Sequence, residues 1–239
     1  MKYMVTCATM ESNFGATRTL AREYNSILPC YGIHPWFLDS LSEKWEQTLG
    51  DWVSAQACGL GETGLDFMDR GGDRDLQIRV FKAHLTLAND LKRPVNIHVR
   101  KAWDALIRIL KQTGPLKAPG LIHSYSGSAD LVGLLEKYNL FISFSGSVTR
   151  PNAKKTIKAV RAVSRDRVLL ETDAPDIFPS LDGEKRKWAF LNEPANLVPI
   201  GRVAAQKRGM DEKDFLESAW ANSLRVFGPV LGGKRLVNE

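Results

Sequence analysis

The sequence predicts an α/β protein built as a TIM (β/α)8-type barrel. Short apolar segments of strand character alternate with segments of helical period along the whole chain, which is typical of a parallel sheet covered by helices. Strand after strand also ends in a histidine or a carboxylate, as expected where the carboxyl ends of barrel strands form a site. With 239 residues, 44% of them hydrophobic, the chain is long enough to bury one core of this size.

Apolar runs bounded by turn residues predict the strands. The predicted strands cover residues 3–8, 28–34, 57–62, 94–99, 120–126, 140–146 and 168–174. Most are rich in Val, Ile, Leu and Phe, as strands buried on both faces are. The last of them, VLLETDA, places Glu171 and Asp173 at the end of an apolar run, where carboxylates need a partner such as a cation. Because side chains alternate along a strand, we expect these two carboxylates to share one face.

Between the strands, apolar residues recur at helical spacing. The predicted helices cover residues 41–52, 76–91, 103–110 and 211–224. Gly114 stands where a helix would stop, Pro151 where one would start, and Asp211 where the last helix would be capped. Since no Pro/Gly/Ser-rich linker divides the chain, we expect a single domain over residues 1–239.

Composition and charge narrow the class of partner. The net charge of +6 and the pI near 9.2 favour an anionic partner such as a nucleic acid, although surface lysines kept for solubility give the same total. The three cysteines, Cys7, Cys30 and Cys58, form no CxxC pair, so we expect reduced core thiols. No stretch approaches the roughly 20 apolar residues of a membrane span, and nothing near the start resembles a signal peptide. We therefore expect a cytoplasmic protein with no membrane partner, and favour a monomer.

The polar residues that end the strands are the candidate site. They are His34, Glu62, His98, His123 and Asp173. Because the carboxyl ends of all strands in a parallel barrel share one face, we expect Glu62, His98, His123 and Asp173 to converge in one pocket. Imidazoles and carboxylates together suit zinc, manganese or magnesium. The sequence therefore predicts a divalent-metal site.

Longer blocks of sequence carry a family resemblance. GIHP, GETGLD, RPVNIHVRKAWD, IHSYSGS, ISFSGSVT, VLLETDAP and NEPANL follow one another from about residue 4 to residue 228. In order and spacing they resemble the signature blocks of the TatD family of metal-dependent deoxyribonucleases, a branch of the amidohydrolase-like TIM barrels.

The resemblance implies hydrolysis of phosphodiester bonds in DNA, often as an exonuclease, with two divalent ions (Mg²⁺, Mn²⁺ or Zn²⁺). It also implies that Glu62, His98, His123 and Asp173 ligate metal. Glu62 would bridge the two ions, and Asp173 would also accept the proton of the attacking water, so these two carboxylates are the predicted catalytic residues.

One family feature has no counterpart. The family's first strand carries an HxH pair of metal ligands, whereas none of the four histidines of this sequence is separated from another by one residue. If VLLETDA is the eighth strand, counting backwards makes residues 3–8 the second. We therefore expect the chain to start just before the second strand, to lack the first, and to have impaired activity.

The remaining polar residues are assigned by position. His34, Arg100 and Glu171 are predicted substrate contacts, with a surface ion pair as the alternative for Arg100. His84 lies mid-helix without a carboxylate at ligand spacing, so we expect a structural role. Asp66 could serve only to hold a turn. Two other function classes stay open: hydrolysis of a C–N or ester bond, and a catalytically impaired barrel that binds nucleic acid.

Overall fold

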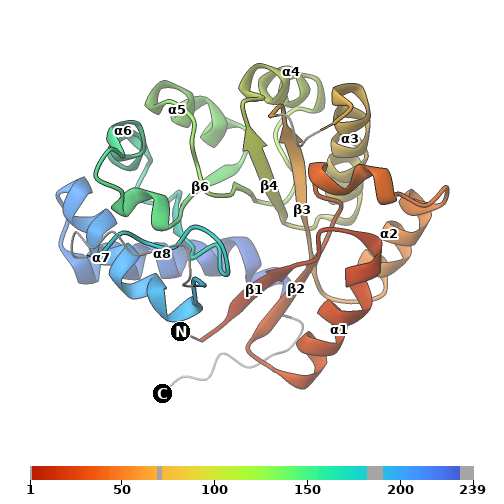
Figure 1. The fold of residues 1–239 in the computed structure, drawn as a ribbon, viewed down its shortest axis with the longest axis horizontal. Coiled ribbons are helices and arrows are strands. Elements are labelled where there is room, and N and C mark those ends of the chain that lie inside the picture. Colours follow the sequence, from red (N-terminus) through yellow and green to blue (C-terminus); the bar gives the residue numbers. More distant parts are fainter. Residues whose placement is uncertain (1, 69–71, 182–190, 232–239) are drawn as a thin grey trace. The chain divides into compact units, whose positions relative to one another are not determined.

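A computed structural model describes residues 2–68, 72–181 and 191–231 and divides the chain into two compact units (Figure 1). The first unit holds residues 1–121 and 225–239, and the second holds residues 122–224. The described residues contain seven strands, one for each strand that the sequence predicts. None of the helices in these ranges combines the length and the apolar character needed to cross a membrane. The single-domain assignment stays a prediction.

The first unit alternates strands and helices. Its strands are β1 (Met4–Cys7), β2 (Ile27–Tyr31), β3 (Gly59–Asp66) and β4 (Val95–Arg100), and β5 (Gly120–Ile122) begins in it. Its helices are α1 (Phe14–Glu23), α2 (Trp45–Ser54), α3 (Arg74–Leu91) and α4 (Trp103–Thr113), with the short 3-10 helices η1 (Glu11–Asn13), η2 (Pro35–Ser40) and η6 (Gly228–Val230). Helices α3 and α4 pack against β3 and β4 on their outer side (Figure 1). Gly114 ends α4, as predicted.

Strands β1 to β4 pair in parallel and in chain order, and the pairing of β3 with β4 contains a bulge. Leu60 pairs with Val95 but Thr63 pairs with Ile97, so β3 has one residue more than β4 between these pairs. A bulge re-aims the side chain of the residue that it contains. Gly61, at φ +127°, supplies the conformation that this requires, and Glu62 follows it. Beyond the bulge β3 continues to Asp66, four residues past the predicted end of the strand at residue 62.

Aromatic packing joins the helices of the first unit to its sheet. Phe14 of α1, Tyr31 of β2 and Trp52 of α2 form a cluster with ring centroids 5.4, 5.5 and 5.6 Å apart. Leu60 of β3 and Leu85 of α3 are also fully buried in this unit. Burial of this apolar surface is the main force that holds the strand ends in place.

His84 of α3 is fully buried and has the structural role that the sequence predicts. Its Nδ1 donates to the carbonyl oxygen of Val80 (2.8 Å), and its Nε2 accepts the N–H of Ile33 (3.0 Å). Burial lowers its pKa from 6.5 to about 4, because the charged imidazolium would lose its hydration. The neutral ring therefore anchors the segment that leads into His34.

The second unit continues the alternation. It contains α5 (Ala129–Lys137), β6 (Leu140–Phe144), η4 (Gly146–Thr149), α6 (Lys154–Ala162), β7 (Val168–Leu170), η5 (Pro194–Asn196), α7 (Leu197–Arg208) and α8 (Glu212–Phe227), whose last residues belong to the first unit. Strands β6 and β7 pair in parallel. Asp211 caps α8 by accepting the N–H of Asp214 (3.1 Å), as predicted. Helix α6 begins at Lys154, three residues after the predicted start at Pro151.

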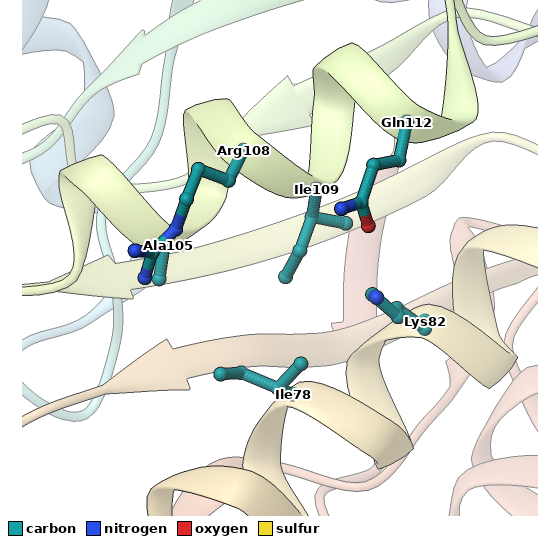
Figure 2. Close-up of a pocket in the computed structure, with 6 residues that line it drawn as sticks. All are labelled: Ile78, Lys82, Ala105, Arg108, Ile109 and Gln112. Carbon is teal, nitrogen blue, oxygen red and sulfur yellow. The ribbon is translucent and has the colours of Figure 1, made fainter.

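A small pocket lies between α3 and α4 on the first unit (Figure 2). Its lining consists of Ile78, Lys82, Ala105, Arg108, Ile109 and Gln112. The lining offers cationic and apolar side chains but no carboxylate, imidazole or thiol, so it has neither metal ligands nor an acid–base pair. The groups of side chains that could hold a metal ion lie at or just after the strand ends instead.

Candidate metal centre

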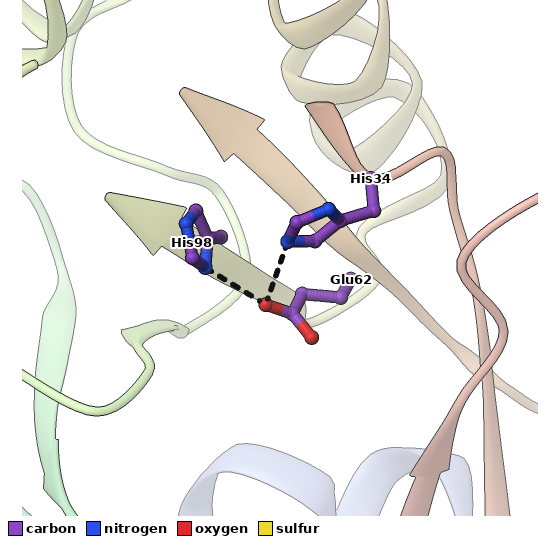
Figure 3. A group of neighbouring side chains, drawn as sticks. All are labelled: His34, Glu62 and His98. Atoms are coloured by element: carbon purple, nitrogen blue, oxygen red, sulfur yellow. Dashed lines mark hydrogen bonds and ion pairs between the residues drawn. The ribbon is translucent and has the colours of Figure 1, made fainter. Parts of the chain in front are cut away.

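The first donor set consists of His34, Glu62 and His98, all in the first unit (Figure 3). Glu62 comes from the β3 bulge, His98 from β4, and His34 from the segment after β2. Figure 3 shows the Glu62 carboxylate between the two imidazoles: its Oε1 lies 3.4 Å from His34 Nε2 and 3.1 Å from His98 Nδ1. All three side chains are mostly buried. The structure thus brings together two predicted metal ligands and one predicted substrate contact.

The hydrogen bonds of His34 determine what its ring can do. Its Nδ1 accepts the N–H of Trp36 (3.2 Å), which caps the start of η2. Because a neutral imidazole has one accepting and one donating nitrogen, the proton lies on Nε2, which faces Glu62. A ring in this state donates from Nε2 and has no lone pair there for a metal. The geometry therefore favours His34 as a hydrogen-bond donor.

His98 is held between two carboxylates. Its Nδ1 faces Glu62, and its Nε2 lies 3.2 Å from Oδ2 of Asp66, which is fully buried. Asp66 also accepts the indole N–H of Trp36 (2.7 Å) and the N–H of Met68 (3.0 Å). Burial by itself would raise the pKa of Asp66, but the hydrogen bonds from His98, Met68 and Trp36 lower it to about 2. Asp66 is thus an ionised carboxylate behind His98 as well as the holder of a turn.

The second donor set consists of His123, Glu171 and Asp173, all in the second unit. His123 Nδ1 lies 2.9 Å from Oε1 of Glu171, and His123 Nε2 lies 3.5 Å from Oδ1 of Asp173. His123 is therefore also held between two carboxylates, one at each ring nitrogen. The second set repeats the arrangement around His98.

The prediction that Glu171 and Asp173 share one face of a strand is wrong, because neither residue lies in the strand. Strand β7 ends at Leu170, and Asp173 has a left-handed backbone with φ 61°, so strand alternation does not extend to it. Both carboxylates nevertheless reach His123, from opposite sides of its ring. The loop conformation, not the strand, aims Asp173.

Glu171 is fully engaged by donors. Its Oε1 accepts the N–H of Ser124 (2.6 Å) in addition to facing His123, and its Oε2 accepts the hydroxyl of Ser143 (2.6 Å). Ser124 has φ 41°, in the left-handed region, which turns its N–H toward Glu171. These contacts indicate that the Glu171 carboxylate orients His123. They do not favour the substrate contact that the sequence predicts for Glu171.

Asn192, which has no predicted role, holds the loop after β7 through its side-chain amide. Its side-chain amide donates to the carbonyl oxygens of Thr172 (2.6 Å), Asp176 (2.7 Å) and Ile177 (3.2 Å). It therefore fixes the loop that contains Asp173. The NEPANL block was its only signal in the sequence, because an amide 19 residues from Asp173 has no local pattern that reveals its target.

The donor atoms fit divalent metal ions. Metal–ligand bonds of about 2.0 to 2.2 Å place neighbouring donors about 3 to 3.5 Å apart. Oε1 of Glu62 and Nδ1 of His98 are 3.1 Å apart, and Nε2 of His123 and Oδ1 of Asp173 are 3.5 Å apart. The other nitrogen of each histidine faces a second carboxylate, which is the usual support of a metal-bound imidazole. Each set thus offers one imidazole and one carboxylate as ligands.

Arg100 and the four predicted metal ligands complete the set of predicted site residues. Arg100 is exposed at the end of β4, two residues after His98 on the same face of the strand. Glu62 contacts His98, and His123 contacts Asp173. The convergence of these four in one pocket stays a prediction. The two donor types present are imidazole, which suits Zn²⁺, and carboxylate, which suits Mg²⁺, Mn²⁺ and Zn²⁺.

Parallel strands that end in two imidazole–carboxylate sets define an α/β enzyme of the metal-dependent hydrolase class. Comparison with known proteins agrees: the family model of TatD related DNases matches residues 1–228. The uncharacterized metal-dependent hydrolase YabD of Bacillus subtilis is 30% identical over 211 residues, which cover 87% of this chain and 80% of YabD. The 3'-5' ssDNA/RNA exonuclease TatD of Erwinia tasmaniensis is 31% identical over 198 residues, which cover 82% and 76%. The chain belongs to the TatD family of metal-dependent hydrolases.

A solved structure supports the same assignment. YJJV, a TatD homolog from Escherichia coli, matches with a TM-score of 0.88 and 25% identity over 95% of this chain and 87% of YJJV. This likeness confirms the predicted α/β class and its TIM-barrel type. The use of divalent metal, predicted from the strand-end residues, agrees with the relatives and with both donor sets.

Proposed function

We propose that this chain hydrolyses phosphodiester bonds in DNA as an exonuclease, with divalent ions held by Glu62, His98, His123 and Asp173. One observation carries the proposal: His98 and His123 each lie between a carboxylate suited to ligate metal and a second carboxylate suited to orient the ring. The exonuclease named among its relatives supports the choice of substrate.

The ions would supply the electrophilic chemistry. When bound, a divalent cation acidifies water and neutralises the negative charge that develops on a phosphoryl oxygen. Mg²⁺, Mn²⁺ and Zn²⁺ all accept these ligands, and we include all three in the proposal.

The protein's own residues position and move protons. Asp66 and Glu171 hold His98 and His123 in the tautomers that leave the ligating nitrogens unprotonated. Asp173, fixed by the Asn192 clamp on its loop, accepts the proton of the attacking water at a carboxylate oxygen.

Two further residues contact the substrate in this proposal. His34 carries its proton on Nε2, beside Glu62, and this N–H donates a hydrogen bond to a phosphoryl oxygen. Arg100, exposed on the face of β4 that carries His98, binds a second phosphate through its planar guanidinium. The proposal includes a single-domain monomer acting in the cytoplasm, where the three free cysteines stay reduced.

The test measures cleavage of end-labelled single-stranded DNA with Mg²⁺, Mn²⁺ or Zn²⁺, and then with excess EDTA. We expect progressive shortening from one end that requires metal. Asp173→Asn should lower the rate at least 100-fold, because an amide neither balances the charge of a cation nor accepts a proton.

Asp176→Asn is the matched control, since this exposed carboxylate lies outside both donor sets. It should leave the rate within twofold of the unmodified chain. Cleavage that persists in EDTA would refute the proposal. So would metal-dependent hydrolysis of amide or ester substrates in a chain that leaves phosphodiesters intact.

A further inference from the structure

Helix α6 of the second unit presents a row of cations, which we call the basic face of α6. It consists of Arg150, just before the helix, and Lys154, Lys155, Lys158 and Arg161 on it. All five residues are exposed, and the opposite side of the helix buries Ala159 and Val160. The helix, KKTIKAVRA, contains no acidic residue. The basic face is therefore a continuous positive stripe directed away from the core.

In the described part of the chain no carboxylate balances the lysines of this face, and Arg161 donates from Nε to the carbonyl oxygen of Lys207 (2.7 Å). Within the part of the chain that the structure describes, Lys154, Lys155 and Lys158 form no ion pair. Helices α7 and α8 of the same unit differ, because Arg202 pairs with Glu212 (3.0 Å) and Lys213 lies 3.9 Å from Glu217.

The spacing of these charges opposes helix formation. Lys154 and Lys158 are four residues apart, and Lys158 and Arg161 are three apart, so like charges lie side by side on the helix surface. Lys154 and Lys155 also occupy the first turn, where the helix dipole favours negative charge. Departures from local helix rules are expected at functional sites, and a bound anion would relieve the repulsion between these charges.

The start of the basic face lies at the same end of the sheet as the second donor set. Ser143, the donor to Glu171, is in β6, and Ser145, just after the strand, is hydrogen-bonded to Ser124 (2.7 Å). The chain then passes through η4 into Arg150 and α6, which contacts η4. In parallel α/β units a helix begins at the end of the sheet where the preceding strand finishes. The first turn of α6 therefore lies on the side of His123 and Asp173.

The chemistry of the face indicates its ligand. From Lys154 to Arg161 the helix rises about 10 Å, which matches about three nucleotides of a stacked strand. The helix carries no aromatic residue on which a base could stack, so its contacts are with phosphates. An anionic membrane is less suitable, because the exposed side of α6 has no Trp, Phe or Leu to insert.

We propose that the basic face of α6 binds the phosphodiester backbone of a single DNA strand, independently of base sequence, and holds it beside the second donor set. The proposal rests on the proposed function for the identity of the strand as substrate. It adds a binding surface outside the residues that hold metal.

The first test measures binding without catalysis. Fluorescence anisotropy of labelled oligo-dT in EDTA, between 50 and 200 mM salt, gives the affinity and its salt dependence. The triple variant Lys154→Gln, Lys155→Gln, Lys158→Gln should bind roughly 10- to 100-fold more weakly at about 100 mM salt. The slope of log K against log salt should become less negative by about 2, because three phosphate contacts are lost. The helix should remain folded, because glutamine is a good helix former and the repulsion is removed.

A control variant separates the face from net charge. Lys82→Gln, Lys111→Gln, Lys117→Gln removes the same three charges from exposed positions of the first unit and should bind within twofold of the unmodified chain. Equal binding by the two triple variants, with equal salt slopes, would overturn the proposal. Binding of anionic phospholipid vesicles in place of DNA would overturn it as well.

A second measurement distinguishes this proposal from the proposed function. With a long oligonucleotide the α6 variant should show a raised KM and a retained kcat, whereas hydrolysis of bis(p-nitrophenyl) phosphate, too small to reach α6, should be unchanged. Binding that depends on α6 without any metal-dependent hydrolysis would refute the proposed function alone. Hydrolysis of the oligonucleotide with an unchanged KM would refute the role of α6 alone.

Discussion

Lowering the pH should protonate His84 and destabilise the segment that presents His34. The buried ring accepts the N–H of Ile33 at Nε2 and donates to Val80 at Nδ1. A proton on Nε2 would place two N–H groups against each other and bury a charge in the core. Because Ile33 directly precedes His34, the loss would reach the first donor set.

The magnitude follows from the pKa. Burial lowers the pKa of His84 from 6.5 to about 4, which at ~1.36 kcal/mol per pKa unit corresponds to about 3 kcal/mol. Between these two values the unfolded chain binds a proton that the folded chain excludes, so stability falls as the pH falls. About 2 kcal/mol of the unfolding free energy should be lost by pH 5 and about 3 by pH 4. That is a large part of a typical stability of about 5 to 15 kcal/mol.

Urea unfolding followed by tryptophan fluorescence, at pH values from 8 to 4, measures this loss. Other groups also titrate in this range, so the comparison is with His84→Leu, which cannot bind a proton. The variant should be less stable at pH 8, because the N–H of Ile33 loses its acceptor. The difference between the two proteins should shrink by about 2 kcal/mol on going to pH 5.

A difference in unfolding free energy that stays constant from pH 8 to pH 5 would refute the reasoning. It would mean that His84 titrates near its ordinary pKa in the folded protein, and hence that water reaches the ring. Metal should be absent from these measurements, since ligand protonation would add its own pH dependence.

Three substitutions test the support of the two donor sets. Asp66→Asn should weaken metal affinity about 10- to 100-fold, measured by isothermal titration, because the amide orients His98 less strongly than a carboxylate; unchanged affinity would exclude the orienting role. Glu171→Gln should lower the rate of hydrolysis and raise KM little, since it acts through His123; a raised KM at full kcat would instead favour the substrate contact. Gly64→Ala should lower the melting temperature, because Gly64 has φ +145° and a methyl group there would collide with the carbonyl oxygen of His98; an unchanged melting temperature would contradict this geometry.

The amino-acid sequence by itself predicted all seven strands, the helices α2, α3, α4 and α8 and the identity of the strand-end donors, but it gave no prediction of α1, α5 or α7. Apolar period and turn residues are local properties, so all seven strands and the structural role of His84 could be predicted from them. Because strand ends carry the chemistry in this class of fold, Glu62, His98, His123 and Asp173 could be selected without coordinates.

Only the tertiary structure decided which atoms of these residues meet. The bulge at Gly61 and Glu62 aims Glu62 at His98, 36 residues away, and the left-handed backbone of Ser124 aims its N–H at Glu171, 47 residues away. A hydrogen bond between such distant residues depends on backbone conformations that periodicity does not encode. For this reason the donor role of His34, the orienting role of Asp66 and the clamp formed by Asn192 followed from packing.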